Sequence, residues 1–218
     1  MHIECNLPIL YFGTPVVLIS TKNEDGSDNI APFSSIFWLT SRCVIGISAS
    51  SHTSVNLLRE KECVLNLPSV KQVNAVNALA KTTGKRNLPK AKVEKGYVYN
   101  PDKFSLAGLT PVSSQYLKAN RAAECPVQME AKVKAVNSLG EDDPLLRGRI
   151  LYIELDIIKI YADESILWPG TTNRIDPDRW KPLIMSFQEF YTTGEKAAYS
   201  RLAEIPEHSY RILRPIAG

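Results

Sequence analysis

The sequence lacks the short motifs that mark several large enzyme classes. It contains no G-x-G-x-x-G, which argues against a Rossmann dehydrogenase and against a doubly wound flavoprotein. Neither Ser34 nor Ser51 lies in a G-x-S-x-G motif, so a hydrolase is disfavoured and no catalytic residue is assigned. Gly84-Lys85 is followed by Arg86 rather than by Ser or Thr, so this segment is not a P-loop.

Histidine and cysteine are also scarce. The three histidines, His2, His52 and His208, are far apart in the chain, and the four cysteines include no Cys-x-x-Cys pair. We therefore predict neither a metal site nor a disulfide framework. Cys43 and Cys63 lie in apolar runs, a position typical of buried free thiols. These observations favour a reducing compartment, and the expected location is the cytoplasm.

Strong charge and long hydrophobic runs are missing as well. The formal net charge of +3 is too small to indicate a nucleic-acid partner. The apolar run at 15–19 has the length of a strand, and no segment approaches a membrane span. The first residues have no basic region followed by an apolar one, so we expect no signal peptide. The 44% hydrophobic content is ordinary for a globular domain.

What is present is a series of short strand-like segments. Strands are predicted where β-branched residues are dense or apolar and polar residues alternate, at 16–21, 43–48, 62–67, 127–135, 149–162 and 182–187. Asp25-Gly26 predicts a hairpin between the first strand and Asn29. Within 127–135 the alternation places Gln128 and Glu130 on the face away from the core. The fold class is therefore mainly β with short helices, and a barrel is favoured.

Helical segments are shorter. We predict helices at 54–61, 69–81, 100–107 and 195–204, and an irregular tail at 210–218. Residues 82–96 break the periodicity, and 81–96 carry six basic side chains, which indicates either a solvated loop or a basic arm near an anionic ligand. Residues 190–194 are predicted to close over a ligand site.

The junction between the strand 43–48 and the helix 54–61 carries a cluster of hydroxyl groups. Ser50, Ser51 and Thr53 lie there, and Ser51 or Thr53 is predicted to cap the helix. The unpaired N–H groups of a first helical turn, together with the helix dipole, form an anion site. The alternative is that these residues only cap the helix and form turns.

The order of several motifs resembles the flavin reductase-like family of FMN-binding split barrels. The motifs are Asn29-x-Ala-Pro-x-Ser-Ser35, a β run that ends at Ser48, Thr53-x-x-Asn56, Asn66-Leu-Pro68, Thr82-Thr-Gly84, Lys103-Phe-x-x-Ala-Gly-Leu-Thr-Pro111 and Glu124-Cys-Pro-Val-Gln-Met-Glu130. The resemblance implies a split β-barrel of the FMN-binding type. We expect one domain over 1–218, with a barrel core at about 10–162 and a C-terminal extension at about 163–218.

The resemblance also implies a cofactor site. Asn29 and residues 31–35 would line the isoalloxazine, residues 48–50 would contact the ribityl chain, and the helix start would bind the phosphate. Thr83 and either Lys85 or Arg86 would add further contacts. The predicted cofactor-binding residues are Asn29, Ala31, Pro32, Phe33, Ser34, Ser35, Ser48, Ser50, Ser51, Thr53, Asn56, Thr83 and Lys85.

The activity implied by the resemblance is that of an NAD(P)H-dependent flavin reductase, in which hydride passes from the nicotinamide of NADH or NADPH to flavin N5. The family's FMN lies across a dimer interface, so we expect a homodimer, and a monooxygenase or another acceptor would receive the electrons. A non-enzymatic, flavoredoxin-like FMN electron-transfer protein is the alternative. A related split barrel without flavin is the third possibility. We expect no partnership with nucleic acid or with a membrane.

Overall fold

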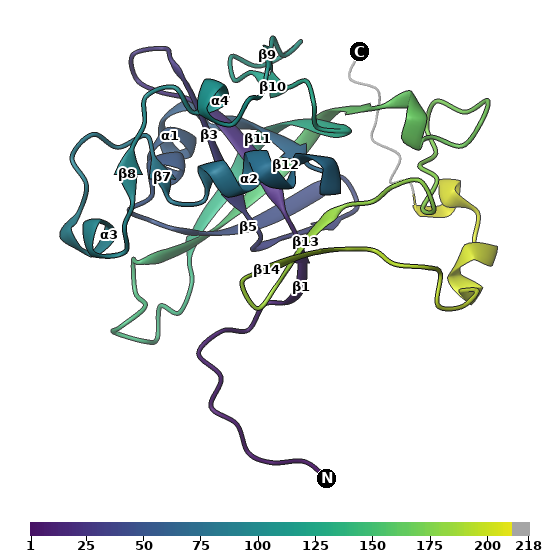
Figure 1. The fold of residues 1–218 in the computed structure, drawn as a ribbon, viewed down its shortest axis with the longest axis horizontal. Coiled ribbons are helices and arrows are strands. Elements are labelled where there is room, and N and C mark those ends of the chain that lie inside the picture. The colour runs from purple at the N-terminus through teal and green to yellow at the C-terminus, as the bar shows by residue number, and fades with distance from the viewer. Residues whose placement is uncertain (211–218) are drawn as a thin grey trace.

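The computed structural model describes residues 1–210, and its main feature is a seven-stranded antiparallel sheet (Figure 1). The strand order is β3-β2-β6-β11-β12-β5-β4. These strands are β2 (Val17–Lys22), β3 (Asp28–Phe33), β4 (Ile36–Leu39), β5 (Arg42–Ser48), β6 (Glu62–Leu67), β11 (Val127–Ser138) and β12 (Ile150–Ala162). The mainly β fold is confirmed, as are the strands predicted from alternation and β-branching.

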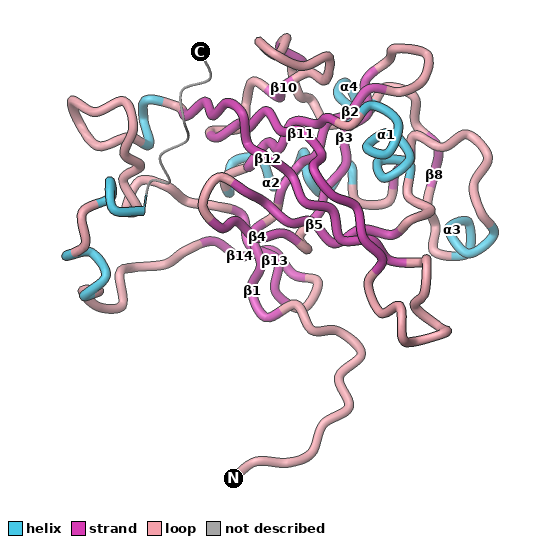
Figure 2. Tube along the Cα trace, turned by 180° about the vertical axis from the view of Figure 1, so that it is seen from behind, coloured by secondary structure: helices cyan, strands magenta, loops and turns pink. Residues whose placement is uncertain are grey.

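Three small sheets surround the large one. They comprise β1 (Phe12–Pro15) with β13 (Leu183–Ser186) and β14 (Glu189–Thr192), β9 (Pro111–Val112) with β10 (Arg121–Ala122), and β7 (Thr82–Thr83) with β8 (Val98–Tyr99). Within the C-terminal part, β13 and β14 lie centrally beside β1, whereas residues 163–170 and 195–210 lie on the opposite side of the molecule from α1 and α3 (Figures 1 and 2). The N-terminal segment extends away from the body of the protein (Figure 1).

Short helices connect the strands. They are α1 (His52–Glu60), η1 (Val70–Gln72), α2 (Val73–Leu79), α3 (Lys90–Glu94), α4 (Lys103–Leu106), η2 (Glu164–Ile166), η3 (Arg201–Glu204) and η4 (Glu207–Tyr210). The helices predicted at 54–61, 69–81 and 100–107 are confirmed in position, whereas α3 within 82–96 was not predicted. The irregular tail was predicted at 210–218, and residues 211–218 lie outside the described part of the chain.

The helix predicted at 195–204 is wrong. Only the 3₁₀ turn η3 forms there, and residues 195–200 are irregular. Leu202, which would have anchored the helix, is 68% exposed. Because an isolated short helix is only marginally stable in water, a helix without a buried face has too little packing to hold it.

Two hydrophobic cores hold the sheet, one on each face of β2. Val17 and Ile19 belong to the first core, which they form with residues of β5, β6 and β12. Val16 and Leu18 belong to the second, where they meet Val76 of α2 and other residues of α2, α4 and β13. Each fully buried Ile or Leu contributes about 1.5–3 kcal/mol. The second core thereby places α2 and α4 against the end of β3.

One prediction for β11 is wrong: Gln128 and Glu130 are buried rather than facing solvent. Glu130 accepts the backbone N–H groups of Gln115 and Tyr116 at 2.7 and 2.9 Å, and the Tyr161 hydroxyl at 2.8 Å. The loop that joins β9 to β10 therefore covers this face of the strand. Hydrogen bonds to the carboxylate compensate for its removal from water.

Within 1–210, no group of three or more His, Cys, Asp and Glu side chains could hold a metal ion. In the same range, no helix is long and apolar enough to cross a membrane. Cys43 and Cys63 are buried free thiols, as predicted, and burial raises the pKa of Cys43 to about 12.

Candidate functional site

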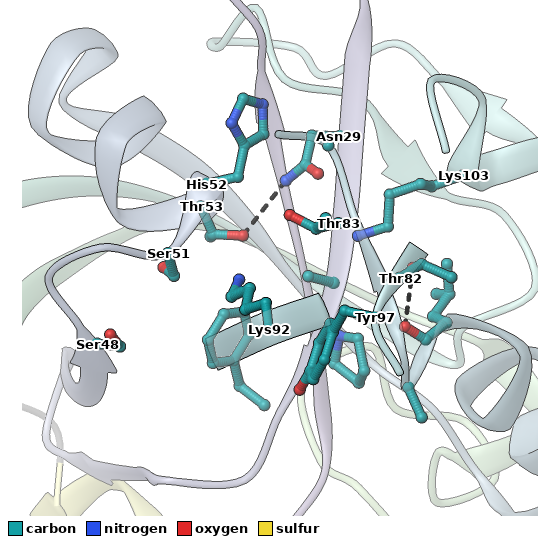
Figure 3. Close-up of a pocket in the computed structure, with 16 residues that line it drawn as sticks. Asn29, Ser48, Ser51, His52, Thr53, Thr82, Thr83, Lys92, Tyr97 and Lys103 are labelled. Atoms are coloured by element: carbon teal, nitrogen blue, oxygen red, sulfur yellow. Dashed lines mark hydrogen bonds between the residues drawn. The ribbon is translucent and has the colours of Figure 1, made fainter. Parts of the chain in front are cut away.

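A cavity of about 210 Å³ lies where β3, the start of α1, the β7 segment and α4 meet (Figure 3). Eight of the residues predicted to bind a cofactor line it: Asn29, Ala31, Pro32, Phe33, Ser48, Ser51, Thr53 and Thr83. His52, Lys92 and Lys103 also line it and were not in the predicted set. The fold therefore brings together residues that lie up to 74 positions apart, from Asn29 to Lys103.

The start of α1 faces this cavity. Ser51 is the N-cap, with extended backbone angles, and its hydroxyl accepts the backbone N–H of Ser54 at 3.0 Å. The backbone N–H groups of His52 and Thr53 have no acceptor among residues 1–210. The first turn of α1 also contains no acidic side chain. These free donors and the positive end of the helix dipole favour an anion at this position.

Asn29 connects β3 to the helix start. Its side chain is 1% exposed, and its amide nitrogen donates to the hydroxyls of Thr21 at 3.2 Å and Thr53 at 3.3 Å. Its carbonyl oxygen is buried and has no hydrogen-bond partner in the described chain. Because buried polar atoms in native proteins nearly always have a partner, this atom indicates an interaction that a ligand completes.

Asn56 does not line the cavity, although it was in the predicted phosphate set. It is fully buried one turn further along α1, where its amide nitrogen donates to Thr21 at 3.0 Å and to Asn23 at 2.9 Å. Its carbonyl oxygen accepts from Arg59 at 3.1 Å. Asn56 thus attaches α1 to the β2–β3 hairpin and positions the helix start from behind.

His52 and Gly84 are in close contact beside the cavity. The His52 Nε2 atom lies 2.7 Å from the Asn23 Oδ1 atom. A Cβ atom on Gly84 would lie 2.5 Å from His52 Cδ2 and 3.0 Å from Asn29 Oδ1, so a larger residue would displace both side chains. Burial lowers the pKa of His52, and the nearby charge of Lys103 lowers it further, so this imidazole is neutral at pH 7.

Lys103 is a site residue that we did not predict. It begins α4, which Asp102 caps by accepting the Ser105 N–H at 3.1 Å, and the neighbouring Phe104 enters the second core. With the helix held in this way, the Lys103 side chain is 2% exposed and its ammonium group points into the cavity (Figure 3). Burial, and secondarily the charge of Lys92, lowers its pKa from 10.5 to about 7.

The remaining predicted residues are distributed around the first cavity. Ser34 lines an adjoining cavity, Ser35 bonds to the Tyr11 hydroxyl at 2.9 Å, and Ser50 bonds to Ser48 at 3.1 Å. Ser35 and Ser50 do not line the first cavity. Lys85 and Arg86 line a third, more open cavity on the far side of Gly84, where Arg86 lies 5.6 Å from the ring centre of Tyr99.

The adjoining cavity, of about 370 Å³, is lined mainly by apolar and aromatic side chains. Its walls include Tyr11, Phe33, Tyr97 and Phe190, and it shares Pro32, Phe33, Ala80 and Tyr97 with the first cavity. Phe190 belongs to β14 and is the residue of 190–194 that lines this cavity, while closure of the segment over a ligand stays a prediction. The adjoining cavity of 370 Å³ lies within the usual range of about 300–1,000 Å³ for a small-molecule site, and the smaller, polar and cationic cavity of 210 Å³ extends it.

Comparisons with known proteins identify the family and the fold. Residues 9–175 match the model of the flavin reductase like domain. The uncharacterized protein YdfE of Bacillus subtilis is 35% identical over 193 residues, which are 88% of this chain and 90% of that protein. Among solved structures, the flavoredoxin of Desulfovibrio vulgaris (Miyazaki F) has a TM-score of 0.73 at 20% identity, covering 94% of this chain and all of the other. An FMN-binding domain of a flavin reductase-like enzyme from Shewanella baltica has a TM-score of 0.62 at 15% identity, covering 86% and 90%.

Proposed function

Because the chain belongs to the flavin reductase-like family, we propose that it binds FMN and passes hydride to it from NADH or NADPH. The observation that carries the proposal is the set of free hydrogen-bond donors at the start of α1, which open onto a cavity beside an aromatic compartment. Such a pair of compartments suits a ligand with a phosphate at one end and a flat ring system at the other.

The residues present fit a phosphorylated flavin. The N–H groups of His52 and Thr53 and the hydroxyl groups of Ser51 and Thr53 would hold the phosphate, with the ammonium groups of Lys92 and Lys103 nearby. Among the described residues, no Asp or Glu lines either cavity, so nothing there repels an anion. The unpartnered carbonyl oxygen of Asn29 remains for a donor on the ligand.

The ring system would lie along residues 31–33 of β3, with Tyr97 and Phe190 supplying apolar and aromatic surface. When bound, FMN supplies a hydride acceptor at its N5 atom. The chain contributes position, since the reaction needs neither a nucleophile nor a strong acid. This agrees with a site in which we find no triad and a neutral His52.

We also propose that the protein is a homodimer. Edge strand β4 exposes Phe37 and Leu39, whose side chains are 58% and 70% accessible. An exposed edge strand with large apolar side chains is a position that proteins usually cover. Sedimentation analysis tests the proposal: a monomeric mass at micromolar concentration would contradict it.

A flavin electron-transfer protein is the second candidate, and the likeness to a flavoredoxin favours it. The two candidates differ in their response to nicotinamides. We would record the visible absorption spectrum of the purified protein loaded with FMN, and record it again after adding NADH or NADPH without oxygen. Bleaching of the flavin bands within minutes supports the reductase. Bands that persist with both nicotinamides but bleach with dithionite support the carrier. A protein that does not bind FMN would refute both.

A further inference from the structure

Lys103 is a buried cation without a counter-charge. Its side chain is 2% exposed, yet among residues 1–210 it forms no ion pair or hydrogen bond with any side chain. Lysine is almost never fully buried unless it is paired. The side chain points into a cavity rather than into the core, so the missing partner belongs in that cavity (Figure 3).

No described neighbour could neutralise it. Besides Lys103, the charged or titratable groups that line the cavity are His52 from α1, Lys92 from α3 and Tyr97, and none of them is a carboxylate. Helix α2 contains no charged residue. Two acids adjoin cavity residues in the sequence, and both already have partners. Asp28, beside Asn29, pairs with Lys22 at 2.7 Å, and Asp102, beside Lys103, caps α4.

The position of Lys103 relative to α1 identifies the kind of partner. In Figure 3 its ammonium group points towards Thr83 and Asn29, and the hydroxyl of Thr53 at the start of α1 lies just beyond Asn29. The positive end of the α1 dipole and the ammonium group therefore enclose one space from two sides. A doubly charged, oxygen-rich group satisfies both.

We propose that Lys103 is a buried ligand of the cofactor's phosphate, and that binding of FMN is coupled to uptake of a proton by Lys103 whereas binding of riboflavin is not. This inference rests on the proposed function, since it takes FMN as the ligand. It assigns to Lys103 the selection of a phosphorylated flavin over its dephosphorylated form.

The coupling follows from the environment of the amine. Burial and Lys92 hold the pKa of the Lys103 amine at about 7 in the free protein, so the amine is mostly neutral at pH 8.5. A phosphate dianion beside the amine favours the ammonium form, and the free phosphate of a nucleotide is already a dianion at this pH. Binding then takes up about one proton, and FMN affinity should fall about tenfold per pH unit above pH 7.

Isothermal titration calorimetry at pH 8.5 tests this directly. FMN and riboflavin are titrated in two buffers of different ionisation enthalpy, which gives the number of protons taken up. The proteins are wild type, Lys103→Met and a control, Lys90→Met, which alters an exposed lysine on α3. We expect about one proton with FMN and none with riboflavin for wild type and the control. In Lys103→Met we expect no uptake, FMN affinity weaker by about tenfold or more, and riboflavin affinity unchanged.

Other outcomes would overturn the inference. Equal weakening of FMN and riboflavin in Lys103→Met would mean that the lysine acts on the ring or on the shape of the cavity. Unchanged FMN affinity in this variant would exclude the phosphate role of Lys103. Absence of proton uptake by wild type would exclude the coupling. If wild type bound neither flavin, the proposed function itself would fail, which is a result distinct from these.

Discussion

Replacement of Lys103 by Met should stabilise the cofactor-free protein, and the gain should depend on pH. The lysine pKa is 10.5 in the unfolded chain and about 7 in the folded protein. Between these values unfolding takes up a proton, so the wild-type protein becomes less stable as the pH falls from 10.5 to 7. Below pH 7 the full penalty is present. Met has a similar length and no charge, so it removes the penalty.

The magnitude follows from the two pKa values. A fall from 10.5 to about 7 corresponds to about 5 kcal/mol, because one pKa unit is about 1.4 kcal/mol. This is an upper limit, since relaxation of the surroundings and entry of water reduce it. We expect Lys103→Met to be more stable than wild type by about 2–5 kcal/mol at pH 6, with the difference falling by about 1.4 kcal/mol per pH unit above pH 7.

Urea unfolding followed by tryptophan fluorescence at pH 6, 7, 8 and 9 would measure this difference in proteins stripped of flavin. Lys90→Met is the control, because its side chain is exposed and its effect should stay within about 0.5 kcal/mol at every pH. The reasoning would be refuted by a stability difference that is the same at pH 6 and pH 9, or by a variant that is less stable than wild type at pH 6.

Three further substitutions test other contacts. Thr53→Ala should weaken FMN binding by about 1 kcal/mol or more, because it removes a hydroxyl at the helix start. Fluorescence titration measures this affinity, and an unchanged value would contradict the phosphate assignment. Gly84→Ala should weaken FMN binding because the added methyl group displaces His52 and Asn29. Gly194→Ala is the control, because nothing lies within 4 Å of the added methyl group there. Equal FMN affinities of the two variants in the same titration would argue against the Gly84 contact. Glu130→Gln should lower the free energy of unfolding by about 1–3 kcal/mol, because the carboxylate accepts two backbone N–H groups and a tyrosine hydroxyl. A variant as stable as wild type in urea would show that these hydrogen bonds contribute little.

Patterns between residues close in the chain were enough to predict much of this fold. Strand β2 was predicted from its density of β-branched residues, and α1 with its Ser51 cap from a hydroxyl group that precedes a helical segment. These features depend on backbone preferences and on hydrogen bonds that span three residues, which one sequence contains in full. The order of the motifs was also sufficient to identify the flavin reductase-like family.

Such local patterns could not predict contacts between segments that are far apart in the sequence. Glu130 has the alternation of an exposed residue, yet a loop 14 to 15 residues earlier covers it and supplies its donors. Asn56 lies in the predicted motif, but the β2–β3 hairpin engages its side chain. Leu202 had a helical neighbourhood and found no core to pack against. In each case the surroundings of the side chain depend on which distant segment of the chain packs against it.

Lys103 shows the same division within the site itself. Its sequence neighbours predict the short helix, because Asp102 caps α4 and Phe104 is apolar. Nothing local indicates that the lysine between them is buried beside Asn29 and the start of α1, since that depends on how α4 packs against β3 and α2. The chain alone therefore determined the elements and the hydroxyl-rich helix start. The packing of those elements determined which charges face the cavity, because desolvation and electrostatic attraction act between groups that only the folded chain brings together.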